Sequence, residues 1–145
     1  MTTKDLSLTH LIKPSNLNQA SPLILMLHGY GSDEKDLFAF ANYLPDNYTV
    51  ISVRAPYPMQ PMGNAWYAIN FDADANKFSD TKQGIASRER IKTFIAEAVE
   101  AYNINPEEVT LFGFSQGTIL SFATALTYPN LVKNIIGLSG YIDKN

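Results

Sequence analysis

The sequence predicts an α/β fold in which a mostly parallel sheet carries helices on both faces. Four short runs support this, because each is apolar at nearly every position, as in strands that are covered on both faces. They are residues 23–27 (LILML), 48–53 (YTVISV), 109–112 (VTLF) and 135–138 (IIGL). Helical patterns lie between them, and alternating strands and helices are typical of the crossover units that build a parallel sheet.

The other elements follow from the spacing of apolar side chains. Residues 5–12 (DLSLTHLI) alternate apolar and polar side chains, as an edge or antiparallel strand does. Helices are expected over residues 33–44, 81–102 and 116–128, and Ser32 or Asp33 is the expected N-cap of the first. The positions expected to be buried are Leu37, Phe40, Ala41 and Leu44 in the first helix, and Ile91, Ile95, Ala98, Val99 and Tyr102 in the second.

Composition excludes several classes of protein. With 46% apolar and 17% charged residues, the chain is ordinary for one globular domain, expected to span residues 1–145. A net charge of −3 gives no electrostatic reason to expect nucleic acid. The absence of cysteine removes disulfides, thiolate nucleophiles and cysteine metal sites. No apolar run suits a secretory signal or a membrane span, so we expect a cytoplasmic protein without stable membrane anchoring.

The stretch GFSQG, residues 113–117, matches the G-x-S-x-G nucleophile elbow. An elbow places serine at a sharp turn between a strand and a helix, and glycines flank it because larger side chains would collide there. The expected strand precedes this motif and the expected helix follows it. Ser115 is therefore the candidate nucleophile. The alternative is a tight turn of a nucleotide-binding or flavodoxin-like fold, where the glycines serve backbone geometry alone.

A second glycine-rich turn, HGYGS at residues 28–32, follows the first buried strand. It lacks the third glycine of the dinucleotide fingerprint and the G-K-[ST] of a P-loop, so an oxyanion loop fits it better than a phosphate cradle. In that role the main-chain N–H groups of Tyr30 and Gln116 hold the negative oxygen of a tetrahedral intermediate. We expect His28 to brace this loop, and His10 to be exposed or structural, rather than either to act as general base.

Together these turns resemble the phospholipase/carboxylesterase group of α/β-hydrolases, which includes carboxylesterases, lysophospholipases and acyl-protein thioesterases. The resemblance covers the chain from residue 23 to the C-terminus. It implies the α/β-hydrolase fold and a Ser-His-Asp hydrolase of small-molecule carboxylic esters or thioesters, with no metal or cofactor. The matching stretches are LHGYGSDEKDL (27–37), VRAP (53–56), AWYAI (65–69), RERI (88–91), VTLFGFSQGTILSFATAL (109–126) and GLSGYI (137–142).

The resemblance also implies an apolar acyl groove in the segment 55–79. This segment contains three prolines and no clear periodicity, and it is longer than a plain connection. Packing within the loop is an equal alternative for each groove candidate taken singly. The candidates for substrate binding are Met59, Met62, Trp66, Tyr67 and Phe71.

In this family the catalytic acid and histidine follow the nucleophile in the chain. After Ser115 the sequence contains no histidine and one acidic residue, Asp143. We therefore expect the missing C-terminal strands and helices, with the acid and the histidine, beyond residue 145, and this chain alone to be poorly active. The strand from Ile135 to Leu138 then becomes an exposed apolar edge, which we expect to be covered by another copy of the chain in a homo-oligomer, by a further part of the protein, or by a local rearrangement. The alternatives left open are a non-catalytic ligand- or nucleotide-binding domain and an inactive interaction protein.

Overall fold

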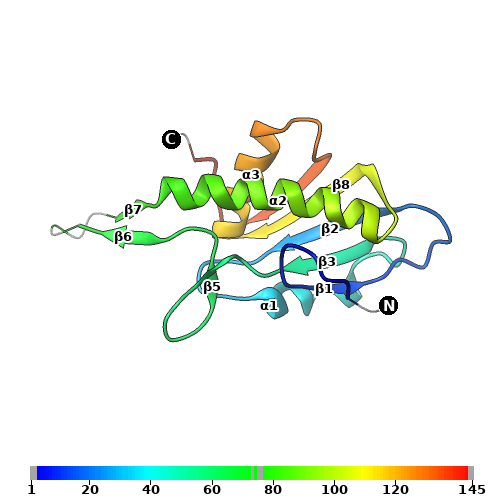
Figure 1. Cartoon of the computed structure of the whole chain (residues 1–145), viewed down its shortest axis with the longest axis horizontal. Helices are drawn as coiled ribbons and strands as arrows, with labels where there is room; N and C mark the ends of the chain where they lie inside the picture. The colour runs from blue at the N-terminus through cyan, green and yellow to red at the C-terminus, as the bar shows by residue number, and fades with distance from the viewer. Residues whose placement is uncertain (1–2, 73, 75–76, 144–145) are drawn as a thin grey trace.

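A five-stranded sheet forms the centre of the molecule (Figure 1). The computed structural model describes residues 3–72, 74 and 77–143, and within them the strand order is β1-β3-β2-β8-β9. Strands β2 (Ser21–Leu27), β3 (Thr49–Val53), β8 (Ile104–Phe114) and β9 (Asn134–Leu138) run parallel, whereas β1 (His10–Lys13) is antiparallel to β3. The predicted mostly parallel sheet with an antiparallel edge strand is confirmed.

The N-terminal strand is shorter than the alternating pattern suggested. It begins at His10, because the preceding residues run against α2 (Thr81–Ala101) instead of continuing along the sheet. There the backbone N–H of Lys4 donates to the Tyr102 hydroxyl, and Arg90 donates to the carbonyl of Ser7. Alternation in this segment therefore reflects packing on a helix as well as pairing with a strand.

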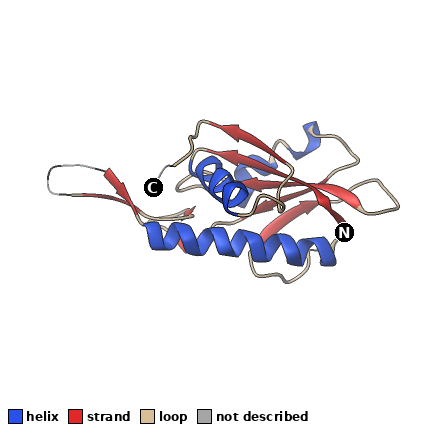
Figure 2. Cartoon of the chain, turned by 90° about the horizontal axis from the view of Figure 1, so that it is seen from above, coloured by secondary structure: helices blue, strands red, loops and turns tan. Residues whose placement is uncertain are grey.

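Helices cover both faces of the sheet, as predicted. On one face α2 and α3 (Gln116–Thr127) pack on the larger core, which includes Leu25, Leu111 and the buried α2 residue Phe94. On the other face α1 (Glu34–Phe38) and the 3₁₀ turn η1 (Ala41–Tyr43) cover a smaller cluster around Met26. Figure 2 shows α2 lying along the sheet. Successive β2 side chains alternate between the two clusters, as a strand covered on both faces requires.

The first predicted helix is divided into α1 and η1. Asp33 caps α1 as expected, since its side chain accepts a hydrogen bond from the Lys35 N–H at 2.8 Å. Leu37 and Ala41 are buried, but the expected burial of Phe40 is wrong, because its side chain is 53% exposed. Phe40 lies at the break between the two pieces, where the 3.6-residue period stops and the buried face can no longer be extrapolated.

The segment 55–79 contains two small hairpins. β4 (Tyr57–Pro58) pairs with β5 (Asn64–Ala65), and β6 (Ile69–Phe71) pairs with β7 (Lys77–Ser79). The second hairpin extends from the body of the molecule (Figure 1). The segment is thus more regular than its prolines suggested, and it connects the sheet to the N-terminus of α2.

Strand β9 is at the border of the described sheet, with β8 as its neighbour. Ile135 packs against the larger core, but Ile136 and Leu138 are 41% and 45% exposed. The apolar run therefore does form a strand, although its side chains are not covered on both faces here. Association of copies through this edge stays a prediction.

Candidate active site

Ser115 occupies the turn between β8 and α3. Its φ of 53° and ψ of −113° are strained for a residue with a side chain. Its N–H donates to the carbonyl of Leu138 at 2.8 Å, and its carbonyl accepts from the N–H groups of Thr118 and Ile119. The side chain is half-buried. The strand, strained turn and helix that a nucleophile elbow needs are all present at this serine.

The two glycines of the motif permit close backbone packing. A Cβ built on Gly117 lies 2.0 Å from the carbonyl oxygen of Leu27, in β2. A Cβ built on Gly113 lies 2.6 Å from the backbone nitrogen of Thr118. Both contacts are with backbone atoms, which cannot rotate aside. Side chains at these two positions would therefore collide with the backbone, as the sequence motif implied. The glycines allow α3 to pack directly against the end of β2.

The HGYGS turn lies directly beside the elbow. A Cβ built on Gly29 is 3.2 Å from Cδ1 of Phe114 and 3.6 Å from Cβ of Ser115. The next residue, Tyr30, is 39% exposed. Two turns that are far apart in the sequence therefore meet at the carboxyl ends of neighbouring parallel strands, which is where open α/β sheets bind ligands.

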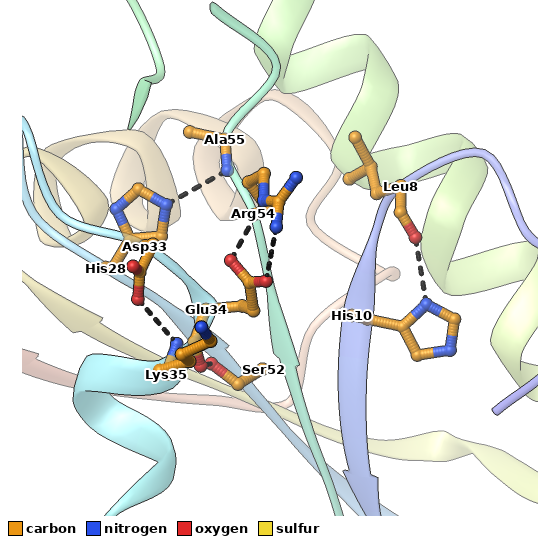
Figure 3. Close-up of polar contacts among 9 residues, drawn as sticks. All are labelled: Leu8, His10, His28, Asp33, Glu34, Lys35, Ser52, Arg54 and Ala55. Atoms are coloured by element: carbon orange, nitrogen blue, oxygen red, sulfur yellow. Dashed lines mark hydrogen bonds and ion pairs between the residues drawn. The ribbon is translucent and has the colours of Figure 1, made fainter. Parts of the chain in front are cut away.

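His28 braces this turn from inside the protein, as expected (Figure 3). Its side chain is fully buried, its Nδ1 donates to the carbonyl of Gly29 at 2.7 Å, and its Nε2 accepts from the N–H of Ala55 at 3.0 Å. This pattern requires a neutral ring with the proton on Nδ1. Burial lowers the pKa of His28 below its ordinary value of 6.5, which favours that neutral form.

An ion pair between Arg54 and Glu34 also supports the HGYGS turn. Arg54 donates from Nε and Nη2 to both carboxylate oxygens of Glu34, at 2.9 and 2.8 Å (Figure 3). The Ser52 hydroxyl donates to the backbone carbonyl of Glu34 at 2.6 Å. The guanidinium lowers the pKa of the Glu34 carboxyl. The pair joins the start of α1 to the end of β3, directly behind the HGYGS turn.

The β4–β5 hairpin supports the turn from its other side. The N–H of Gly31 donates to the carbonyl of Asn64, and the N–H of Asn64 donates to the carbonyl of Ser32, each at 2.9 Å. Gly63 has φ of +86°, and a Cβ there lies 2.0 Å from the carbonyl oxygen of Gly31. The role of this hairpin could not be predicted from the sequence, because its pairing with the turn joins residues about thirty positions apart and leaves no local period.

A cavity of about 80 Å³ opens beside Ser115, and we call it the serine cavity. It brings together four of the predicted site residues, namely Ser115, Tyr30, Gln116 and Tyr67. Burial and the nearby Tyr141 and Asp143 raise the pKa of Tyr67 to about 12, so its phenol is neutral near pH 7. The remaining lining residues, which the sequence did not reveal, are Ile69, Ser79, Ile119, Ser139 and Tyr141.

The Gln116 side chain has its own role in the site. It is buried, its Oε1 accepts from the N–H of Trp66, and its Nε2 donates to the carbonyl of Tyr67, both at 2.8 Å. These bonds connect the first residue of α3 to a loop about fifty positions earlier in the chain. The Gln116 amide therefore holds in place the loop from which Tyr67 lines the serine cavity.

The other groove candidates lie elsewhere. Trp66 is fully buried and donates its indole N–H to the carbonyl of His28 at 2.9 Å, so it supports the HGYGS turn from the core. Met59 is half-buried near Gly31, and Met62 is 77% exposed; neither is among the described residues that line the serine cavity. The side chain of Phe71 lies outside the described part of the structure.

Comparison with known proteins identifies this arrangement. A sequence model of the phospholipase/carboxylesterase family matches residues 11–145. The chain belongs to the phospholipase/carboxylesterase family. It has the α/β-hydrolase fold that its sequence predicts, because a solved carboxylesterase and a solved esterase superpose on most of it.

Relatives and solved structures show how much of a family member the chain represents. Acyl-protein thioesterase 1 of Kluyveromyces lactis is 28% identical over 137 residues, which are 88% of this chain and 60% of the relative. The Bacillus cereus carboxylesterase superposes with a TM-score of 0.81 at 20% identity, covering 96% of this chain and 63% of that one. Esterase PE8 superposes at 0.76 with 27% identity, over 94% and 66%. The chain spans about 60% of the length of the curated acyl-protein thioesterases that it matches.

The described residues of this family member lack two kinds of feature. None of their helices combines the length and apolar character needed to cross a bilayer. Among the same residues, no three His, Asp or Glu side chains are grouped as ligands of a metal ion.

The buried His28 of this phospholipase/carboxylesterase family member predicts a pH-dependent stability. Because its folded pKa is below 6.5, its contribution is fully present above pH 6.5 and is lost as the unfolded chain takes up a proton below that pH. We expect the free energy of unfolding to fall between pH 7 and pH 5, by up to about 1.4 kcal/mol per pH unit for one proton.

Urea unfolding at pH 7, 6 and 5 measures this dependence. In His28→Gln the amide oxygen replaces the acceptor without titrating, so its profile should be flatter than that of the wild type. A wild-type profile that is flat over this range, or parallel to that of the variant, contradicts the role assigned to His28.

Proposed function

We propose that the whole protein is a serine hydrolase that cleaves carboxylic esters or thioesters through an acyl-enzyme on Ser115. The serine cavity carries this proposal, because Ser115 stands there on a strained turn and Tyr30 and Gln116 line the same space. The proteins that the chain resembles bear the names acyl-protein thioesterase, carboxylesterase and esterase, which supports the same reaction class.

In the proposed reaction Oγ of Ser115 attacks the carbonyl carbon, and its proton passes to a general base. Negative charge develops on the carbonyl oxygen and is held by the N–H groups of Tyr30 and Gln116. Gln116 is the first residue of α3, where N–H groups have no intrahelical partner and the helix dipole is positive. The base then protonates the leaving alcohol or thiol. Water, deprotonated by the same base, attacks the acyl-enzyme, and the base returns that proton to Oγ of Ser115 as the acid is released.

The general base in this proposal is a histidine outside residues 1–145. His10 and His28 are the two histidines of the sequence, and both are structural. His10 is buried and contacts the carbonyl of Leu8 and the hydroxyl of Tyr102 through its two ring nitrogens. His28 uses both of its nitrogens to brace the HGYGS turn. The catalytic acid is likewise proposed to lie outside these residues.

Covalent labelling with a fluorophosphonate tests the assignment without requiring turnover. We expect slow labelling of the 145-residue chain, because an oxyanion hole retains a catalytic effect of about 10³-fold or more when a triad member is absent. Peptide mass spectrometry should place the adduct on Ser115, and Ser115→Ala should abolish it. Ser79→Ala is the matched control, since Ser79 lines the same cavity but is not on the elbow, and it should label like the wild type.

Two outcomes contradict the proposal. An adduct that persists in Ser115→Ala assigns the reactive group elsewhere. A folded wild-type chain that resists labelling, yet is stabilised against heat by a nucleotide, supports the alternative of a nucleotide-binding α/β domain.

A further inference from the structure

The strained backbone at Ser115 depends on the groups that bind it, because a residue in a sparsely allowed conformation persists only where its surroundings fix it. Hydrogen bonds hold the residue, with its φ of 53°, at both ends. The Ser115 carbonyl is bound within α3, by the N–H groups of Thr118 and Ile119. The Ser115 N–H is bound outside the helix, by the carbonyl of Leu138 at 2.8 Å. The elbow therefore depends on the position of Leu138, the last residue of β9.

The hydroxyl of Thr118 holds Leu138 in this position. It donates to the Leu138 carbonyl at 2.8 Å and accepts from the Leu138 N–H at 3.1 Å, so one side chain binds both backbone groups of the residue. The Thr118 side chain is buried, whereas Leu138 is 45% exposed. Because β9 pairs with β8 alone in the described part of the sheet, these two bonds add to a ladder that fixes the strand from one side.

The segment after β9 folds tightly over the same threonine, and we call residues 138–141 the cover loop. Ser139 has φ of 54° and turns the chain between Leu138 and Gly140. A Cβ built on Gly140 would lie 2.4 Å from Cβ of Thr118 and 3.0 Å from the carbonyl oxygen of Ser115. The cover loop therefore lies directly against the elbow, with Thr118 beneath both ends of its turn.

The cover loop also forms part of the serine cavity, because Ser139 and Tyr141 are among its lining residues. The Thr118 hydroxyl is thus connected to the site in two ways. It places the Leu138 carbonyl that binds the Ser115 N–H, and it holds the loop that borders the cavity. Thr118 is not among the described residues that line this cavity, so any effect on the nucleophile passes through its neighbours.

We propose that Thr118 is a positioning residue for the nucleophile, whose hydroxyl holds Leu138 and the cover loop and thereby keeps Ser115 in its strained conformation. A hydroxyl is needed here because it can donate to a carbonyl and accept from an N–H at the same time. Serine shares this property, and valine and alanine lack it. The effect on reactivity rests on the proposed function, whereas the effect on the backbone does not.

Amide hydrogen exchange measures the positioning without requiring any reaction at serine. Thr118→Val has nearly the shape of threonine but removes the hydroxyl, and Thr118→Ser keeps it. We expect the N–H groups of Ser115 and Leu138 to exchange about tenfold faster in Thr118→Val, because losing buried hydrogen bonds shifts a local opening equilibrium by about that factor. Thr118→Ser should restore nearly the wild-type rate. Thr118→Ala also removes the hydroxyl, and it takes the place of Thr118→Val if circular dichroism shows that variant to be unfolded.

Thr124→Val is the matched control. Thr124 is a second buried threonine of α3, but its hydroxyl donates at 2.8 Å to the carbonyl of Leu120, one turn earlier in the same helix. Losing this hydroxyl removes a buried hydrogen bond of the same kind and leaves the contacts of the cover loop unchanged. We expect the Ser115 and Leu138 amides of Thr124→Val to exchange at the wild-type rate.

Fluorophosphonate labelling of Ser115 then relates its position to its reactivity. We expect a rate about tenfold lower in Thr118→Val than in the wild type, Thr118→Ser and Thr124→Val. Unchanged exchange in the folded variant that lacks the Thr118 hydroxyl overturns the inference. An unchanged labelling rate in that variant, or an equal loss in Thr124→Val, also overturns it. If exchange changes as expected but Ser115 is labelled in none of the proteins, the proposed function fails while the hold of Thr118 on the elbow stands.

Discussion

Gly117→Ala is expected to lose about 3 kcal/mol or more of its free energy of unfolding, a large part of the stability of a domain of this size. The added Cβ would lie 2.0 Å from the carbonyl oxygen of Leu27 and 2.7 Å from that of His28. Both are backbone atoms at the end of β2, so relief requires α3 to move away from the sheet. That movement would also displace Ser115, and we expect labelling of Ser115 to fall below detection in any fraction that stays folded.

Gly84→Ala is the control for this change. Gly84 is inside α2, and its added Cβ meets the Tyr67 ring at an ordinary contact distance of 3.6 Å. Because alanine is favoured over glycine in a helix by about 1 kcal/mol, this variant should be neutral or more stable than the wild type. Urea unfolding followed by circular dichroism compares the two variants. A wild-type unfolding midpoint for Gly117→Ala shows that the elbow is not packed against β2 as described.

Gln116→Leu is expected to reduce the free energy of unfolding by about 2 to 6 kcal/mol. Leucine has a similar volume, but it leaves the N–H of Trp66 and the carbonyl of Tyr67 buried without their partner, at about 1 to 3 kcal/mol for each group. Since Tyr67 lines the serine cavity, the labelling rate of Ser115 should fall as well. The main-chain N–H of residue 116 is unchanged by this substitution. A lower labelling rate would therefore show that the part of the cavity lining that carries Tyr67 has moved.

The control for this prediction is a second glutamine that bonds the same loop. Oε1 of Gln83 accepts from the N–H of Ala68 at 2.7 Å, in a partly buried position where water can replace the lost amide. Gln83→Leu is therefore expected to cost about 1 kcal/mol or less. Guanidinium unfolding of both variants gives the comparison. Equal losses in the two would mean that the Gln116 amide is not an important support of the loop.

The nucleophile elbow could be predicted from the sequence because the residues that form it are close together in the chain. Three apolar residues before Gly113, the small residues around Ser115 and the helical spacing after it are all close neighbours in the chain. They indicated the turn because backbone sterics act over a few residues, and the structure confirms the strained serine and the crowded glycines. The cap at Asp33 was visible for the same reason, since its acceptor and the Lys35 donor are two positions apart.

The cavity residues were not visible in this way. Ile119 has the pattern of an ordinary apolar position of a helix, and nothing in the sequence distinguishes a helix face that meets the sheet from one that borders a cavity. Trp66 shows the converse, because an aromatic residue in an aperiodic loop was a candidate for the groove. Its place in the core depends on hydrogen bonds with His28 and Gln116, which are 38 and 50 positions away in the chain.

What could be inferred from the residues alone was therefore the α/β order of elements, the parallel sheet, the strained turn at Ser115 and the bracing role of His28. Each depends on short-range sterics, on the period of a strand or helix, or on a turn whose partners are adjacent. The position of Trp66, the break at Phe40, the amide bridge from Gln116 and the cavity beside Ser115 required the folded chain. They depend on which distant segments meet, and burial and hydrogen bonding between such segments leave no periodic trace in the sequence.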